Sequence, residues 1–103
     1  MNTFKDLRKL KKNWNDYNAE PLIPEYIDTA EELYAILPAN FEIFPLADGG
    51  VQLEYEDKNV YIEFVIEDKI KSYWNKNDCE GEETFTVNNL VFVSEFANFI
   101  ISA

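Results

Sequence analysis

The chain has 103 residues, 47% of them hydrophobic and 16% aromatic, and a formal net charge of −11. This length suits one domain with one core, and the composition excludes an intrinsically disordered chain. The single cysteine, Cys79, excludes an intramolecular disulfide and a site made of several thiolates, so the fold must rest on packing. We therefore predict one acidic domain over residues 1–103.

The charge is unevenly distributed along the chain. Residues 1–12 hold five of the nine basic residues and one acidic residue, a segment charge of +4, which leaves −15 for residues 13–103. A body of this charge repels phosphate backbones, so we expect no direct binding to free nucleic acid. The N-terminal segment lacks the apolar stretch of a signal peptide, and no run reaches the roughly 18 to 20 apolar residues of a membrane span. We therefore expect a cytoplasmic protein without a membrane partner.

Three segments have the apolar spacing of helices. Thr3 can cap a helix over residues 3–12, whose basic residues gather toward its C-terminal end and there complement the helix dipole. A loop rich in Asn and Pro over residues 13–24 precedes a second helical pattern over residues 26–37, which the following proline ends. The third pattern covers residues 90–101.

Between the second and third helices the apolar period changes to two, which is typical of half-buried strands. Pro45 places the first of these strands at a sheet edge or bulge, and residues 76–83 are expected to form a polar loop. The predicted strands cover residues 41–46, 51–56, 60–67 and 70–75, with a shorter one at 84–87.

Turn residues and apolar alternation together suggest how these strands pair. Asp48-Gly49-Gly50 suits a tight hairpin turn and lacks the length and the lysine of a phosphate-binding loop. If Asp57 and Lys58 form the centre of the next turn, the alternation fixes the register. The predicted pairs are Tyr55 with Val60 and Leu53 with Ile62 on the inner side, and Glu54 with Tyr61 and Gln52 with Glu63 on the outer side.

A meander with one apolar face needs a cover, and the amphipathic helices can supply it. The predicted fold class is therefore α+β. We expect a two-layer sandwich in which an antiparallel meander of four to five strands is covered on one face by two N-terminal helices and one C-terminal helix. The opposite sheet face stays solvated.

Few residues offer catalytic or metal chemistry. The chain has no histidine, which removes the commonest general base and metal ligand, and no nucleophile lies in a recognisable elbow. Glu54 and Glu63 are expected to be near neighbours on the open sheet face, whereas acid–base catalysis needs a sheltered cleft that separates two carboxyl pKa values. We expect no catalytic residue and no cofactor, and a small carboxylate-dependent enzyme stays an alternative.

The acidic segment around Cys79 favours neither a metal site nor a reactive thiol. Neighbouring negative charge raises the pKa of a thiol and suppresses the thiolate. A calcium loop needs a glycine at position six and a bidentate glutamate at position twelve, and both are missing here. We predict a solvated acidic loop that contains Asp78, Glu80, Glu82 and Glu83.

The aromatic residues divide into core and interface candidates. Trp14, Tyr17 and Trp74 are of a kind enriched at interfaces, but in so small a chain we expect them in the core or at its rim. Tyr61 and Tyr73 are the better interface candidates.

Two segments carry a resemblance to a known family. The run N-W-N-D-Y-N-A-E-P-L over residues 13–22 and the run D-G-G-V-Q-L-E-Y over residues 48–55 resemble the motifs N-W-D-x-Y-x-A-x-P-I and D-G-G-I-x-L-E-W of small uncharacterised bacterial and phage-associated proteins. Asn15 replaces the usual Asp, Asn18 a frequent Gly, and Tyr55 the usual Trp. The resemblance, which spans residues 13–75, implies a shared fold and a mobile-element setting and carries no catalytic residue over.

These patterns favour binding to another macromolecule. An acidic, folded sheet face can occupy a basic groove that otherwise holds phosphates. The leading hypothesis is a protein-binding inhibitor that acts against a basic nuclease or nucleic-acid-guided effector, as anti-CRISPR proteins of phages and mobile elements do; the alternative is an antitoxin or immunity-type partner of a basic toxin. The candidate partner-binding residues are Glu54, Glu56, Tyr61, Glu63, Glu67 and Tyr73.

Overall fold

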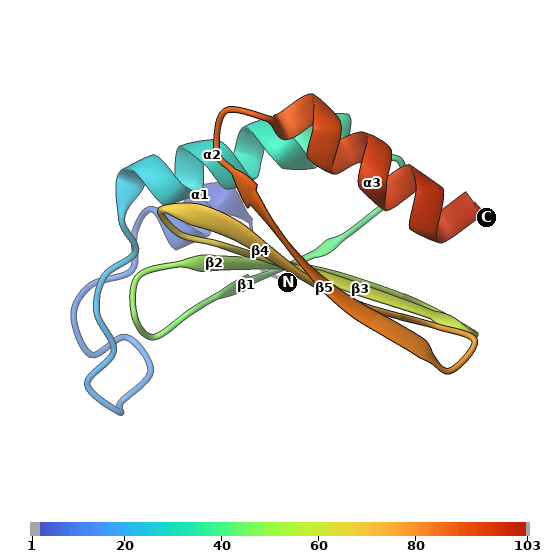
Figure 1. Ribbon diagram of the computed structural model, residues 1–103. Helices are drawn as coiled ribbons and strands as arrows, with labels where there is room; N and C mark the ends of the chain where they lie inside the picture. Colours follow the sequence, from blue (N-terminus) through green and yellow to red (C-terminus); the bar gives the residue numbers. More distant parts are fainter. Residues whose placement is uncertain (1–2, 103) are drawn as a thin grey trace.

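The computed structural model describes residues 3–102 and shows an α+β fold, in which helices pack on one face of a five-stranded antiparallel sheet (Figure 1). This confirms the predicted fold class. The sheet is a meander, because every strand pairs with its neighbour in sequence. The strands are β1 (Glu42–Pro45), β2 (Val51–Asp57), β3 (Val60–Ile66), β4 (Lys69–Lys76) and β5 (Cys79–Thr86).

Helices α2 (Pro24–Ile36) and α3 (Leu90–Ser102) lie close to the predicted segments. Pro24 opens α2, where its fixed φ suits the first turn and its missing N–H costs nothing. The residue before Pro38 is extended, and this ends α2. The two helices meet where the Ser94 hydroxyl donates a hydrogen bond to the Ile36 carbonyl at 2.6 Å.

The first helix is much shorter than predicted. Helix α1 (Phe4–Leu7) begins as expected, since the Thr3 hydroxyl accepts a hydrogen bond from the Asp6 amide at 3.1 Å. It ends after one turn, and residues 8–17 follow as an irregular segment with turns at 8–9 and 12–15 and a bend at 16–17. Trp14 then reaches the core from this irregular segment, held by a hydrogen bond from its indole nitrogen to the Glu20 carbonyl at 2.7 Å. A long helix was therefore not needed to bring Trp14 to the core.

The basic residues of the N-terminal segment do not lie along a long helix as predicted, because α1 ends at Leu7 and Arg8 is its C-cap residue. Arg8 instead forms ion pairs with two carboxylates of α2, at 2.8 Å to Asp28 and 2.9 Å to Glu31. Lys12 pairs with Glu20. These contacts tie the first segment to the second helix and to the following loop.

The core lies between α2, α3 and the inner face of the sheet. Helix α2 packs on β2 and β3, and α3 packs on β3. Phe41 stacks on Phe64 with 5.9 Å between ring centroids, and the side chains of β2 and β3 alternate between buried and partly exposed. The fully buried large side chains are Leu7, Ile27, Leu33, Val51, Leu53, Ile62, Phe64, Ile66, Ile70 and Val93.

Strand β5 covers most of the segment that was predicted to be a polar loop, and this prediction was wrong. Asn77 and Asp78 form the turn with φ angles of 51° and 68°, the left-handed pair of a type I′ hairpin turn. Across the hairpin, Gly81 faces Trp74, whose indole lies 2.7 Å from where a Cβ on Gly81 would be. The glycine, a weak strand former, thus makes room for the largest side chain of β4.

The β2–β3 hairpin turns at Lys58 and Asn59, one residue later than predicted. The predicted register was therefore wrong by two positions on the partner strand. The actual pairs are Tyr55 with Ile62, Leu53 with Phe64, Gln52 with Val65, Glu54 with Glu63 and Glu56 with Tyr61. A shift of two leaves every side chain on its predicted face, so apolar alternation could not reveal the error.

The two segments that carry the family resemblance meet in space. The chain at residues 20–23 runs along the β1–β2 turn, with the Glu20 amide donating to the Ala47 carbonyl at 2.8 Å and the Ile23 amide to the Gly49 carbonyl at 3.0 Å. Gly49 has a φ of 99°, which only glycine adopts readily, and Asp48 accepts the Gly50 amide. This agrees with the structural role predicted for Asp48-Gly49-Gly50.

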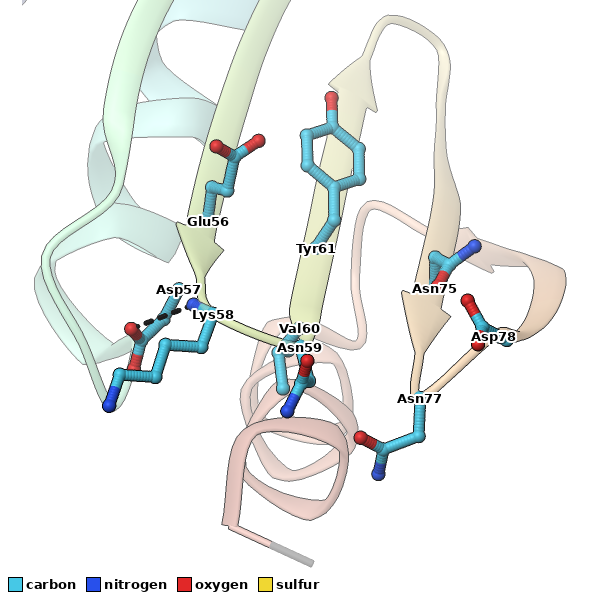
Figure 2. A pocket seen from close by; sticks show the side chains of 9 residues that line it. All are labelled: Glu56, Asp57, Lys58, Asn59, Val60, Tyr61, Asn75, Asn77 and Asp78. Carbon is cyan, nitrogen blue, oxygen red and sulfur yellow. Dashed lines mark hydrogen bonds between the residues drawn. The ribbon is translucent and has the colours of Figure 1, made fainter.

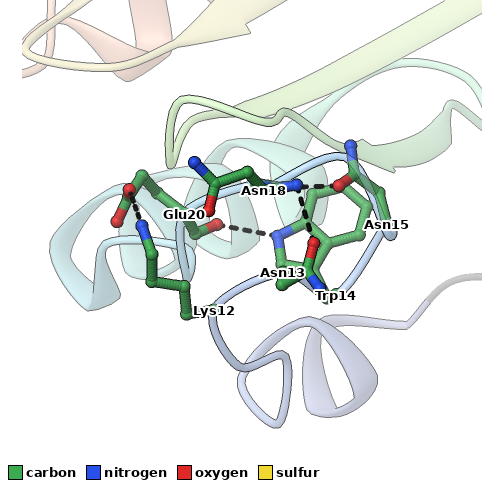
Figure 3. Close-up of polar contacts among 7 residues, drawn as sticks. Lys12, Asn13, Trp14, Asn15, Asn18 and Glu20 are labelled. Carbon is green, nitrogen blue, oxygen red and sulfur yellow. Dashed lines mark hydrogen bonds and ion pairs between the residues drawn. The ribbon is translucent and has the colours of Figure 1, made fainter.

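Asparagine side chains organise the loop before that contact (Figure 3). The Asn13 side chain accepts a hydrogen bond from the Asn18 amide at 2.7 Å, and the Asn15 side chain accepts from the amides of Tyr17 and Ala19. Asn13, Asp16 and Asn18 have φ angles between 62° and 64°, a region that Asn and Asp tolerate. Tyr17 is 87% exposed here, so its predicted place in the core or at its rim was wrong, whereas Trp14 and Trp74 are half-buried.

Candidate partner-binding face

The face of the sheet opposite the helices, called the outer sheet face below, brings most of the predicted binding residues together. Glu54 on β2, Glu63 on β3 and Tyr73 on β4 are direct cross-strand neighbours. Glu56 and Tyr61 pair in the next row toward the hairpin tips. Neighbouring strands lie about 4.8 Å apart, so these five side chains form one continuous cluster.

Glu67 is separated from that cluster. It follows β3 directly and belongs to the turn before β4, at the end of the sheet that borders the β1–β2 turn. There it forms a carboxyl pair with Asp48, and the shared hydrogen bond raises the pKa of Glu67 and lowers that of Asp48. Glu67 therefore belongs to a carboxyl pair at one end of the sheet, and the other five candidates lie at a different place on the face.

The two tyrosines hold their neighbouring carboxylates in place. The Tyr61 hydroxyl donates a hydrogen bond to Glu63 Oε1 at 2.9 Å, and the Tyr73 hydroxyl donates to Glu80 Oε2 at 2.8 Å. Burial and the hydrogen bond to Glu63 raise the pKa of Tyr61 well above its ordinary value, and the hydrogen bond to Glu80 raises the pKa of Tyr73. Both phenols thus remain protonated donors, and their rings lie 6.1 Å apart.

Two further acidic residues of this face were missed because β5 was predicted to be a loop. Glu82 pairs with Tyr73 and Glu80 with Asn75, so both lie on the outer sheet face. Glu42 on β1 adds a carboxylate opposite Glu54. The alternation of residues 79–86 and the turn-forming Asn77-Asp78 were the signals in the sequence that could have located β5.

The outer sheet face continues into a shallow, open depression at the hairpin tips (Figure 2). It has a volume of about 650 Å³ and includes Glu56 and Tyr61, which project from the ends of β2 and β3. Asn75 lies beside them on β4, and Asp78 lies at the β4–β5 turn. Its lining is mainly polar, which suits hydrogen bonding to a charged partner group.

The face also carries positive charge at one end. Lys71 pairs with Val65 of β3 and Thr84 of β5, away from the acidic rows. Within residues 3–102, no group of three or more His, Cys, Asp or Glu side chains is arranged to hold a metal ion. The carboxylates of these rows can thus accept hydrogen bonds and pair with cations, and Tyr61 and Tyr73 can add aromatic contacts.

Comparison with protein-family models, with curated proteins and with solved structures finds no match to this chain. Across the part of the chain that the structure describes, no helix has the length and apolar character needed to cross a membrane. The residues and geometry of the outer sheet face are therefore the basis for any functional assignment.

Proposed function

We propose that this chain is a non-enzymatic binding protein whose outer sheet face binds a basic, nucleic-acid-binding surface of another protein. The observation that carries the proposal is the row formed by Glu54, Glu63, Tyr73 and Glu82 across four adjacent strands. Carboxylates directly opposite each other repel and cost stability, as at the Glu54–Glu63 pair. A partner that neutralises these carboxylates relieves their repulsion, and this favours binding.

The arrangement resembles a charged nucleic-acid backbone in its physical character. The carboxylates are held on a sheet, and the tyrosine hydroxyls fix Glu63 and Glu80, so little side-chain freedom is lost when a partner binds. The partly buried tyrosine rings add apolar area of the kind enriched at protein interfaces. Arginine and lysine side chains that normally contact phosphates would find carboxylates to pair with and tyrosine rings to pack against on this face.

The biological setting that we propose is inhibition of a basic nuclease or nucleic-acid-guided effector by a phage or mobile-element protein. It rests on the acidic face together with the resemblance in residues 13–22 and 48–55. An antitoxin or immunity-type role would use the same face against a basic toxin and would be marked by a toxin gene beside the gene for this chain. A carboxylate-dependent enzyme would need a sheltered pocket around a carboxyl pair, whereas the depression at the hairpin tips is open.

The proposal is tested with two variants of equal net charge. The first neutralises the outer sheet face with Glu54→Gln, Glu56→Gln and Glu63→Gln, and the second neutralises acids elsewhere with Asp6→Asn, Glu25→Gln and Asp68→Asn. Each protein is immobilised and exposed to a bacterial lysate at low and high salt, and the retained proteins are eluted with a DNA oligonucleotide. Circular dichroism checks that both variants fold.

We expect basic nucleic-acid-binding proteins to be retained by the native chain and by the second variant but lost from the first, with oligonucleotide displacing them. Retention should weaken as salt rises, because screening reduces the attraction between charges. Equal retention by all three proteins would show that the outer sheet face does not bind the partner. Failure of the oligonucleotide to compete would remove the phosphate-like mechanism.

A further inference from the structure

A second surface, on the opposite side of the molecule, carries large apolar side chains that nothing within residues 3–102 covers. Helix α3 contains one charged residue, Glu95, in thirteen positions. Val91, Phe92 and Phe99 are 67%, 64% and 68% exposed, although the rest of the helix packs into the core. A helix that is apolar on nearly all sides is normally buried all round.

The exposed residues lie on one stripe of α3. Phe92 and Phe99 are seven residues apart, or about 10.5 Å along the helix axis, and Glu95 lies between them at helical spacings of three and four. Phe92 also contacts Phe85 of β5, with 6.3 Å between ring centroids. We call this stripe and Phe85 the α3 surface.

A groove with a second carboxylate adjoins this stripe. It has a volume of about 590 Å³ and lies at the β5–α3 connection and the start of α3, with Glu32 of α2 at its border. Val91 and Phe92 contribute apolar lining, and Glu95 and Glu32 contribute carboxylates from the two helices. An aliphatic side chain with a cationic end fits such a lining, because its stem contacts apolar groups while its charge meets the carboxylates.

The position of Glu95 argues against a second copy of this chain as the occupant. Two copies of α3 packed antiparallel would place each Phe92 near the Phe99 of its partner, and Glu95 would then face Glu95 at the symmetry axis. Each chain also carries a net charge of −11. Like charges juxtaposed in an interface oppose binding, whereas a lysine or arginine between two apolar residues would complement the stripe.

We propose that the α3 surface binds an amphipathic helix of another protein that presents a basic residue between two large apolar residues. The apolar residues pack beside Phe92 and Phe99, and the basic side chain pairs with Glu95 and reaches toward Glu32. This is helix-in-groove recognition with charge setting the register. The surface is independent of the outer sheet face, so one partner or two can be bound.

The test uses a synthetic helical peptide of about 18 residues, long enough to form a helix on binding. Its apolar stripe carries two leucines seven positions apart with one lysine between them, and a matched peptide has glutamate in place of that lysine. Affinity is measured by fluorescence anisotropy, and the site is mapped by amide chemical shifts. The proteins are the native chain, Glu95→Lys, Phe99→Ala, and Glu25→Lys as a control with the same charge change at the start of α2.

We expect the lysine peptide to bind the native chain and the Glu25→Lys control similarly and to shift amides of α3 and the end of β5. The Glu95→Lys variant should bind the lysine peptide about tenfold more weakly, because two like charges then meet in the interface. The same variant should prefer the glutamate peptide, which restores a pair of opposite charges. Phe99→Ala should also weaken binding without unfolding the chain, since the side chain is largely exposed.

Three results would overturn the proposal. One is equal affinity of both peptides for the native chain, and another is a set of shifted amides confined to the outer sheet face. The third is a concentration-dependent dimer that Phe99→Ala abolishes, which would make a second copy the occupant. The Glu54→Gln, Glu56→Gln, Glu63→Gln variant should still bind the lysine peptide, which separates this outcome from that of the proposed function.

Discussion

The carboxyl groups of Glu67 and Asp48 interact at one end of the outer sheet face, and this pairing makes stability depend on pH in two directions. The pKa of Glu67 is raised, so its contribution is present at low pH and is lost as pH rises through that raised value. The pKa of Asp48 is lowered, so its contribution is lost as pH falls through that lowered value. The pair therefore stabilises the fold most between the two pKa values, where one proton is shared.

Replacement of Glu67 by glutamine should remove the loss of stability at high pH. The amide can still donate a hydrogen bond to Asp48 but carries no charge to repel it. We expect Glu67→Gln to be more stable than the native chain at about pH 8, by about 0.5 kcal/mol because solvent screens the pair, and to lose this advantage near pH 4.5. Urea denaturation at both pH values measures the effect.

Glu56→Gln is the matched control for this substitution. Glu56 lies on the same face but at the opposite end of β2 from Asp48. Its variant should show no comparable change between the two pH values. A stability difference for Glu67→Gln that is the same at both pH values would refute the shared proton.

The β4–β5 hairpin shows how a turn decides the structure of a whole element. Asn77 and Asp78 both have positive φ, and this twist matches that of the flanking strands. Strand β5 then follows although its sequence contains three glutamates and a glycine. Glu80 and Glu82 alternate onto the outer sheet face, where Tyr73 contacts Glu80, and this pairing outweighs poor strand propensity.

Glycine at the second position of that turn should stabilise the protein. A non-glycine residue with positive φ is strained, and Asn-Gly is the preferred pair for such a turn. We expect Asp78→Gly to raise the free energy of unfolding by about 0.5 to 1 kcal/mol, measured by thermal denaturation. Asn59→Gly is the control, because neither residue of the Lys58–Asn59 turn has positive φ, and it should stabilise little or not at all. A destabilised Asp78→Gly would contradict this explanation.

The elements that the sequence predicted well are those with a strong apolar period. Helices α2 and α3 and strands β2, β3 and β4 follow from spacings of 3.6 and 2 residues. Two features depended on something else. The β2–β3 register depended on which residues form the turn, since a shift of two residues leaves every side chain on the same face. The length of α1 could not be read from apolar spacing, because Trp14 packs against the core from the irregular segment after the helix and so matches the helical spacing without being helical.

The candidate site was predictable to the same extent as its strands. Glu54, Glu56, Tyr61 and Glu63 were placed on the correct face because alternation fixes the face whatever the register. Tyr73 lies beside them, but its contact with Glu80 depends on strand β5, whose glutamates and glycine favour a loop. The α3 surface was not predicted at all, because apolar periodicity counts Phe92 and Phe99 as ordinary helix residues and does not reveal which of them the fold leaves uncovered.

The charge of the whole molecule should make its stability depend on salt. A net charge of −11 on a chain whose Cα radius of gyration is 13.6 Å produces repulsion that unfolding relieves. We expect the melting temperature to rise by about 5 °C as NaCl is raised from about 10 to 500 mM, equivalent to about 1 kcal/mol. The ion pairs of Arg8 weaken under the same conditions, but exposed pairs contribute little.

The variant with Glu54→Gln, Glu56→Gln and Glu63→Gln serves as the comparison for the salt effect. It removes three charges from one crowded face, so its melting temperature should be higher at low salt and should rise less as salt is added. Differential scanning calorimetry measures both slopes. A melting temperature that falls with salt would show that attractive pairs, and not repulsion, dominate the electrostatics of the fold.

The meander order of the sheet has a consequence for the route by which the chain folds. Strands that pair only with their sequence neighbours need short loop closures, whereas the contact between residues 20–23 and the β1–β2 turn joins more distant segments. We expect the β2–β3–β4 hairpins to be formed in the transition state and the N-terminal segment to dock afterwards. In stopped-flow experiments, Ile62→Val should slow refolding, and Leu7→Ala should mainly accelerate unfolding. The N-terminal segment would then be the part of the fold that opens first.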